Sequence, residues 1–167
     1  MDILTQLDAD HQQFRIWLRA LDADELGSAA PFFGEKGAKT QTAAFKILKD
    51  FMPELHRHEE IENCLFHQAL IRKSEAAREL LHGMKKEQLM LEHLIKHFRT
   101  ELALSAEKPT RRLIETLEHF SALLLRHMLW EEQYLFPLAK AVFSESELDL
   151  LGHQAEDPAF AEEIPSR

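Results

Sequence analysis

The chain has 167 residues, of which 45% are hydrophobic, and its 29 acidic and 20 basic side chains give a formal net charge of -9. This length suits one domain with a proper core and is too short to expect two. The acidic balance argues against a partner rich in phosphates, either nucleic acid or an anionic membrane.

Cysteine content and the N-terminal sequence both bear on the compartment. The single cysteine, Cys64, can form neither an intramolecular disulfide nor the thiolate set of a zinc ribbon or an iron-sulfur cluster. The N-terminal residues lack the basic and apolar regions of a signal peptide, and no run of about eighteen apolar residues occurs. We therefore expect a soluble protein in a reducing, cytoplasmic compartment.

The first half of the chain predicts two long helices. Apolar residues recur at spacings of three and four over residues 2–21, which is typical of a helix with one inward face. A loop rich in helix breakers follows over about residues 22–39. The second helix covers about residues 40–73, and Pro53 should bend or restart it, because proline removes a backbone donor.

The second half predicts two more long helices. The third covers about residues 75–104, with Ser74 as its N-cap. The fourth begins after a short break at residues 105–109 and ends near Phe136, because Pro137 interrupts the pattern. Four long amphipathic helices joined by short connections predict an all-α fold, an antiparallel up-down-up-down four-helix bundle.

The C-terminal residues predict a short extra helix and a tail. Ser144 and Glu147 have capping-box spacing, which announces a helix over about residues 145–153. Prolines in the last dozen residues suggest a loose tail. The predicted organisation is a bundle over residues 1–155 and a tail over residues 156–167.

Two of the predicted helices repeat one pattern, a histidine four residues ahead of a glutamate. The first pair is His58 and Glu62, and the second is His127 and Glu131. At 100° per residue, a spacing of four leaves the two side chains about 40° apart on one face, so imidazole and carboxylate can reach one metal ion.

Further histidines fall on the apolar patterns of the other two helices, His11 on the first and His93 and His97 on the third. An unpaired ionisable group there would be costly, and a metal would remove that cost. Imidazole and carboxylate without thiolate suit iron, manganese or zinc, and the ligand count favours two bridged ions over one tetrahedral zinc. The alternative is a plain bundle in which these histidines only pack.

The chain resembles the hemerythrin-like, or HHE cation-binding, family over about residues 1–150. The evidence is the two His-x-x-x-Glu blocks, the Leu-Phe at 65–66 after the first, and the Leu-Phe-Pro at 135–137 after the second. The resemblance implies two iron ions joined by an oxo or hydroxo bridge. The implied ligands are His11 and His58 on one iron, His93 and His127 on the other, and Glu62 and Glu131 bridging.

One ligand position stays open between His97 and Glu59. Oxygen-carrying hemerythrins have a second third-helix histidine, which His97 matches, whereas some relatives have a glutamate directly after the second-helix histidine, which Glu59 matches. His97 is favoured, because it lies only about 40° from His93, while Glu59 is turned about 100° from His58.

The acid on the fourth helix departs from the oxygen-carrier pattern, which has an aspartate five residues after the histidine. Here Glu131 is at four and Glu132 at five. Glu132 is rotated about 140° from His127, so Glu131 is the better bridging candidate and replacing Glu132 should do little. The changed spacing argues against simple reversible oxygen carriage.

Five histidines remain outside this set and are interpreted as surface or boundary residues. Two of them, His56 and His67, could be partners of ligands by their closeness in sequence. The five are His56, His67, His82, His119 and His153.

Three functions suit such a centre. A binding protein would take up a small diatomic ligand, oxygen or nitric oxide, for sensing, storage or scavenging. An enzyme would act on peroxide or nitric oxide, and an iron-handling protein would repair or supply iron centres. We favour a metal- and ligand-binding protein over an enzyme; the sequence specifies neither oligomer nor protein partner.

Overall fold

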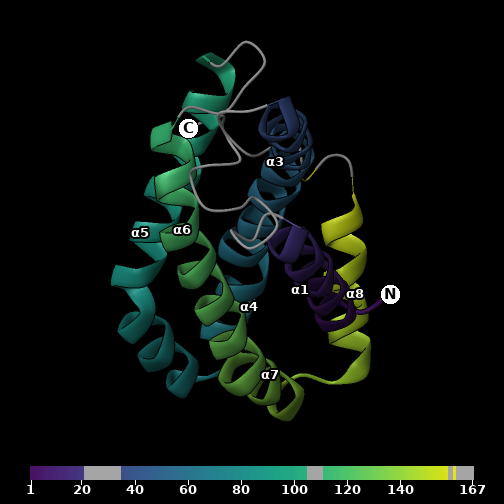
Figure 1. Ribbon diagram of the computed structural model, residues 1–167. Helices are drawn as coiled ribbons and strands as arrows, with labels where there is room; N and C mark the ends of the chain where they lie inside the picture. The colour runs from purple at the N-terminus through teal and green to yellow at the C-terminus, as the bar shows by residue number, and fades with distance from the viewer. Residues whose placement is uncertain (21–34, 105–110, 158–159, 161–167) are drawn as a thin grey trace. The chain divides into compact units, whose positions relative to one another are not determined.

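The computed structural model describes residues 1–20, 35–104, 111–157 and 160, and every regular element in these ranges is a helix (Figure 1). The all-α class, a helical bundle with an extra C-terminal helix, is thereby confirmed. The elements in chain order are α1 (Ile3–Ala20), α3 (Glu35–Ile61), η2 (Glu62–Phe66), α4 (His67–Lys73), α5 (Glu75–Leu104), α6 (Arg111–Trp130), η3 (Glu131–Leu135), α7 (Phe136–Val142) and α8 (Glu145–Glu156). No helix in this part of the chain has the length and apolar character needed to cross a membrane.

Two predicted helix starts are confirmed by their caps. The Ala77 N–H donates to Ser74 Oγ at 3.3 Å at the start of α5. At the start of α8, the Glu147 N–H donates to Ser144 Oγ at 3.4 Å, and the Ser144 N–H donates to the Glu147 carboxylate at 2.9 Å. Both serines thus accept from backbone N–H groups that a first helical turn leaves without a partner.

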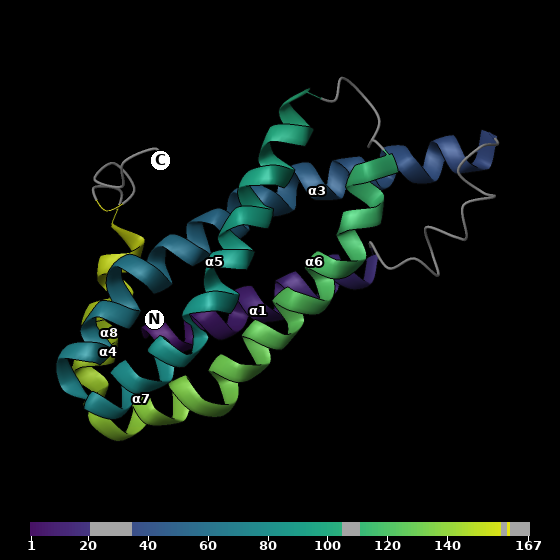
Figure 2. The same cartoon turned by 90° about the vertical axis from the view of Figure 1, so that its left-hand side faces the viewer.

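Two prolines lie inside continuous helical backbone, and neither one ends a helix. α3 runs from Glu35 to Ile61 with Pro53 inside it, so no new helix starts there. The predicted end of the fourth helix near Phe136 is wrong, because the helical backbone continues from α6 through η3 and α7 to Val142 (Figure 2). Pro137 lies in the first turn of α7, directly after η3, where a missing N–H is tolerated.

Other predicted segments lie partly outside the described residues. Of the predicted loop over 22–39, residues 22–34 lie outside the described residues, and α3 already begins at Glu35. The break at 105–109 and most of the tail also lie outside, while α8 extends three residues beyond the predicted end.

Two π-helical turns, which the helical periodicity of the sequence does not predict, begin at the two glutamates of the His-x-x-x-Glu pairs. η2 begins at Glu62 and is closed by a hydrogen bond from the His67 N–H to the Glu62 carbonyl oxygen. η3 begins at Glu131 and is closed in the same way by the Phe136 N–H. Turns of this kind occur mostly as single insertions in α-helices, often at functional sites.

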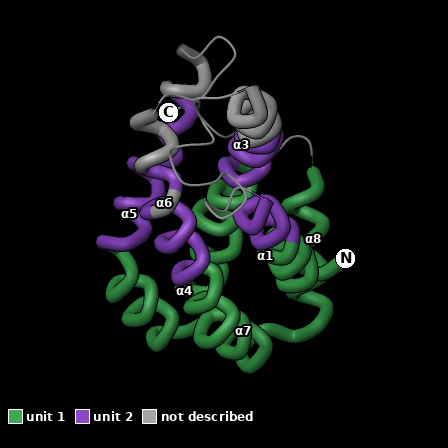
Figure 3. Tube along the Cα trace, viewed as in Figure 1, with its two compact units in different colours: residues 1–12, 57–85, 128–167 green, residues 13–56, 86–127 purple. Residues whose placement is uncertain are grey.

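Contacts group the chain into two compact units (Figure 3): unit 1 is residues 1–12, 57–85 and 128–167, and unit 2 is residues 13–56 and 86–127. The single bundle expected over residues 1–155 therefore stays a prediction. The boundaries of the units fall inside α1, α3, α5 and α6.

Unit 1 has its own apolar core, with residues from α1, α4, α7 and α8, from both π-helical turns, and from the parts of α3 and α5 that belong to this unit. α8 packs against the beginning of α1, where the Gln6 side-chain amide donates to the Gly152 carbonyl oxygen at 3.0 Å (Figure 1). A Cβ at Gly152 would lie 2.0 Å from the Met1 carbonyl oxygen, so only glycine permits this approach. The buried core residues are Ile3, Leu4, Leu7, Ile61, Phe66, Leu70, Ala77, Leu135, Phe136, Ala139, Leu148, Leu151 and Ala155.

Unit 2 is held by an aromatic cluster. Phe51 packs edge-on against Phe14 and Phe120, with ring centroids 5.5 and 6.0 Å apart, and Phe98 packs edge-on against Phe120 at 4.9 Å. All four rings are buried, and edge-to-face pairs add a specific geometry to their apolar burial.

Candidate metal centre

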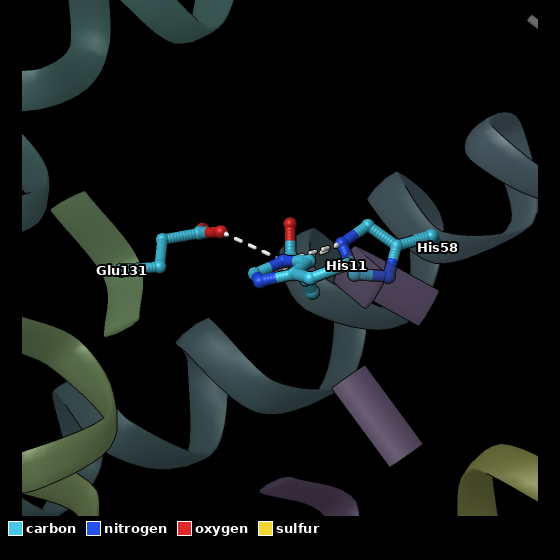
Figure 4. Close-up of side chains that lie close together, drawn as sticks. His11, His58 and Glu131 are labelled. Carbon is cyan, nitrogen blue, oxygen red and sulfur yellow. Dashed lines mark hydrogen bonds and ion pairs between the residues drawn. The ribbon is translucent and has the colours of Figure 1, made fainter. Parts of the chain in front are cut away.

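Four side chains of unit 1 meet in one buried group, which we call the His-Glu group: His11, His58, Glu62 and Glu131. His11 comes from α1, His58 from the last turn of α3, and the two glutamates from the first positions of η2 and η3. One ligand atom of each lies within 4.8 Å of those of the other three. Figure 4 shows the His11 ring between Glu131 and His58.

Distances within the His-Glu group suit a first-row metal ion. His58 Nε2 lies 3.2 Å from His11 Nε2 and 3.1 Å from Glu62 Oε1, and His11 Nε2 lies 3.5 Å from Glu131 Oε2. Two ligand atoms about 2.1 Å from one ion and at right angles are about 3.0 Å apart. The sequence-predicted i, i+4 pair and His11 therefore converge as a metal site requires.

Both histidines have a carboxylate on the ring nitrogen that faces away from the group. His11 Nδ1 lies 2.8 Å from Glu132 Oε1, and His58 Nδ1 lies 3.1 Å from Asp10 Oδ2. A carboxylate in this position keeps the proton on Nδ1, so that the Nε2 lone pair is available to a cation. Metal-ligating histidines commonly have such a partner.

Sequence reasoning missed both outer carboxylates. Rotation from His127 excludes Glu132 as a ligand of the same helix, but the side chain contacts a histidine of a different helix. No spacing rule indicates a role for Asp10, although it directly precedes a predicted ligand. Neither contact follows from spacing within one helix, since each joins residues more than 45 positions apart.

The electrostatics of the His-Glu group favour a positive charge. Burial opposes the charged form of His11, but the Glu131 and Glu62 carboxylates outweigh it and raise the pKa of His11 to about 9. Burial likewise opposes charge on His58, and Glu62 and Asp10 raise the pKa of His58 well above its ordinary value. A metal cation would take the place of these protons.

The ligand roles of the other four predicted residues are not tested by the structure. Glu59 is buried in unit 1, and His127 is buried and is the last residue of unit 2. His97 is half-buried and His93 exposed, both on the part of α5 that belongs to unit 2. The ligand roles of these four residues remain predictions.

The expected inward position of His93 is not observed. The buried positions of α5 around it are Leu91, Ile95 and Phe98, and His93 lies two residues from each of the first two, hence on the other side of the helix. Its side chain lines an open and mostly apolar hollow with Met90 and His119 of the same unit.

Helices in every described segment and a buried group of imidazoles and carboxylates that could hold a cation are the features of a helical cation-binding protein. The family model for the hemerythrin HHE cation binding domain matches residues 2–139, and the chain belongs to this family. The resemblance seen in the two His-x-x-x-Glu blocks is thereby confirmed. A search of curated proteins and a search of solved structures each found no match.

Proposed function

We propose that this protein is a non-haem di-iron protein that binds a small diatomic ligand, oxygen or nitric oxide, for sensing, storage or scavenging. The observation that carries the proposal is the His-Glu group, in which two imidazoles and two carboxylates meet without a thiolate and in burial. Mixed imidazole and carboxylate sets with open positions are typical of non-haem iron, and manganese and zinc are the alternatives. Membership of the HHE family favours iron.

The residues of the chain that would hold one iron are those of the His-Glu group. When bound, iron supplies a redox-active Lewis acid with coordination positions beyond those that the protein fills. His11 and His58 would supply nitrogen ligands through Nε2, and Glu62 and Glu131 would supply oxygens that offset the charge of the ion. The outer carboxylates of Glu132 and Asp10 hold the two rings in place.

Two phenylalanine rings pack next to the His-Glu group. The Phe136 ring stacks on His11 with centroids 5.6 Å apart, and the Phe66 ring meets Phe136 at 6.0 Å. Both phenylalanines are buried. Apolar walls keep bulk water out and favour a small, weakly polar ligand over a large charged substrate.

A second iron would use the other predicted ligands. Glu62 and Glu131 each have two carboxylate oxygens, and the His-Glu group uses one from each, so the other oxygen would be available to a second cation. Glu59 and His127 are buried, as ligands of a closed centre are, whereas His93 is exposed and His97 half-buried. Burial therefore favours Glu59 over His97 for the ligand position that the sequence leaves undecided, and family membership supports His127 as a further imidazole ligand.

The compartment that we propose is the cytoplasm. Cys64 is exposed and forms no disulfide. An exposed free thiol suits a reducing compartment.

Anaerobic reconstitution with ferrous iron tests the proposal. We expect two iron ions per chain, measured by elemental analysis, and an absorption band that appears with oxygen or nitric oxide and disappears on evacuation. Sustained consumption of peroxide or nitric oxide would instead support the enzyme. Absence of bound iron in the wild-type protein would refute the di-iron centre.

A further inference from the structure

His67 is a buried imidazole that the ligand pattern does not include. It is the first residue after η2, only 4% of its surface is exposed, and it belongs to unit 1 like the His-Glu group. Its Nε2 lies 3.5 Å from Oε1 of Glu131. The other oxygen of that carboxylate, Oε2, lies 3.5 Å from His11 Nε2.

The π-helical turn explains how His67 reaches this place. Five residues of a regular α-helix would put His67 about 140° around the helix from Glu62. In η2 the His67 N–H bonds instead to the Glu62 carbonyl oxygen, so these five residues make about one turn. The side chain of His67 is thereby brought back toward the face that carries Glu62.

The second block repeats this arrangement with a different side chain. Phe136 stands five residues after Glu131 and closes η3 as His67 closes η2. Its ring stacks on His11. Equivalent positions of the two blocks therefore both face the His-Glu group, and only one of them offers a nitrogen.

We propose that His67 is a positioning residue that sets the orientation of the Glu131 carboxylate for metal binding. Two imidazoles flank the two oxygens of one buried carboxylate, His67 on Oε1 and His11 on Oε2. An N–H at His67 Nε2 would attract one lone pair of Oε1 and leave Oε2 directed toward the nitrogens of the His-Glu group, while Oε1 keeps a second lone pair for a cation. The inference rests on the proposed metal centre.

Two variants at position 67 separate this role from packing. His67→Phe introduces the side chain that the second block has at the equivalent position, Phe136, and it removes the imidazole nitrogens. His67→Gln keeps an N–H donor near the position of Nε2. His153→Phe makes the same change at an exposed histidine of unit 1 and serves as the matched control.

The measurement is Co²⁺ affinity by competition with a chelator, together with the visible spectrum of the Co²⁺ protein. We expect His67→Phe to weaken Co²⁺ binding about 10- to 100-fold and to change the spectrum, because loss of the residue that orients a metal ligand has an effect of this size. His67→Gln should retain most of the affinity and the wild-type spectrum, and His153→Phe should match the wild type. If His67→Phe does not fold, as judged by circular dichroism, His67→Leu takes its place.

Combination with Glu131→Gln tests whether His67 acts through that carboxylate. The loss from His67→Phe should be smaller in the Glu131→Gln background than in the wild type. Full additivity, or wild-type affinity in His67→Phe, overturns the positioning role. Equal losses in His67→Gln and His67→Phe also overturn it, since that result makes His67 a ligand itself. A wild-type protein that binds neither cobalt nor iron refutes the metal centre as a whole, which is a different outcome.

Discussion

Replacing Glu132 by alanine tests whether the outer carboxylate of His11 matters for metal binding. Because Glu132 is rotated about 140° from His127 around the fourth helix, the sequence predicted that this change has little effect on metal binding. The structure leads to the opposite expectation, because Glu132 Oε1 lies 2.8 Å from Nδ1 of His11, an imidazole with no exposed surface. Removal of the carboxylate leaves the Nδ1 proton buried with no acceptor at that position, and the ring loses the contact that orients it.

The size of the effect can be worked out from the contact. Hydrogen bonds that involve a charged group contribute about 1.5–3 kcal/mol, and loss of a ligand's outer partner lowers metal affinity about 10- to 100-fold. These ranges agree, since that fold-change corresponds to about 1.4–2.7 kcal/mol. Glu132→Gln keeps an acceptor oxygen and loses only the charge, so its loss should be no more than about tenfold.

Chelator competition with ferrous iron under anaerobic conditions measures both variants against the wild type. Asp149→Ala removes an exposed carboxylate from α8 of the same unit and is the control. The expected order of affinity is wild type and Asp149→Ala together, then Glu132→Gln, then Glu132→Ala. Wild-type affinity in Glu132→Ala would show that the contact with His11 has no role and that the prediction from helix rotation was right.

Four further predictions concern the ligands, pH and packing. Glu131→Ala should abolish the gain in stability on adding metal, which for the wild type is about 2.7 kcal/mol at a metal concentration of 100 times Kd; a chelator-sensitive melting temperature in the variant would contradict this. Metal affinity should fall at least about tenfold per unit as pH decreases below about 9, because the ion must displace the proton of His11; a flat profile between pH 6 and 8 would refute that displacement. The stability of the metal-free protein should change with pH in the opposite direction. Because the pKa of His11 is raised to about 9 in the folded state, its proton stabilises the fold fully below pH 6.5, and this stabilisation is lost as pH rises through 9. Gly152→Ala should destabilise the fold by about 1–3 kcal/mol in thermal unfolding, because its methyl group would collide with the Met1 carbonyl oxygen; unchanged stability would mean that α8 can move away from α1.

The local part of the site could be predicted from the sequence. His58 and Glu62 share a face because four residues make slightly more than one helical turn, and this holds whatever surrounds the helix. The capping residues Ser74 and Ser144 were equally predictable, because a cap depends on a few neighbouring residues. His11 was found because it interrupts an apolar stripe, where an ionisable group needs a partner.

Rules based on 3.6 residues per turn failed at the π-helical turns. At 100° per residue His67 would lie about 140° around the helix from Glu62, and Pro137 predicted the end of the fourth helix near Phe136. Neither holds, because each π-helical turn has one extra residue and shifts the register of the helix beyond it. The exposure of His93 shows a related limit, since an apolar pattern with several possible faces does not say which one is buried.

By itself, the sequence determined the helical class, the family and the residues able to bind a cation, because periodicity and ligand spacing are properties of short segments. Only the tertiary structure decided which carboxylate contacts which imidazole. Asp10 and His58 are 48 positions apart and His11 and Glu132 are 121 apart, so their contacts exist only once separate helices have packed. The same packing gave His67 and His11 opposite oxygens of Glu131, an arrangement that no spacing within one helix encodes.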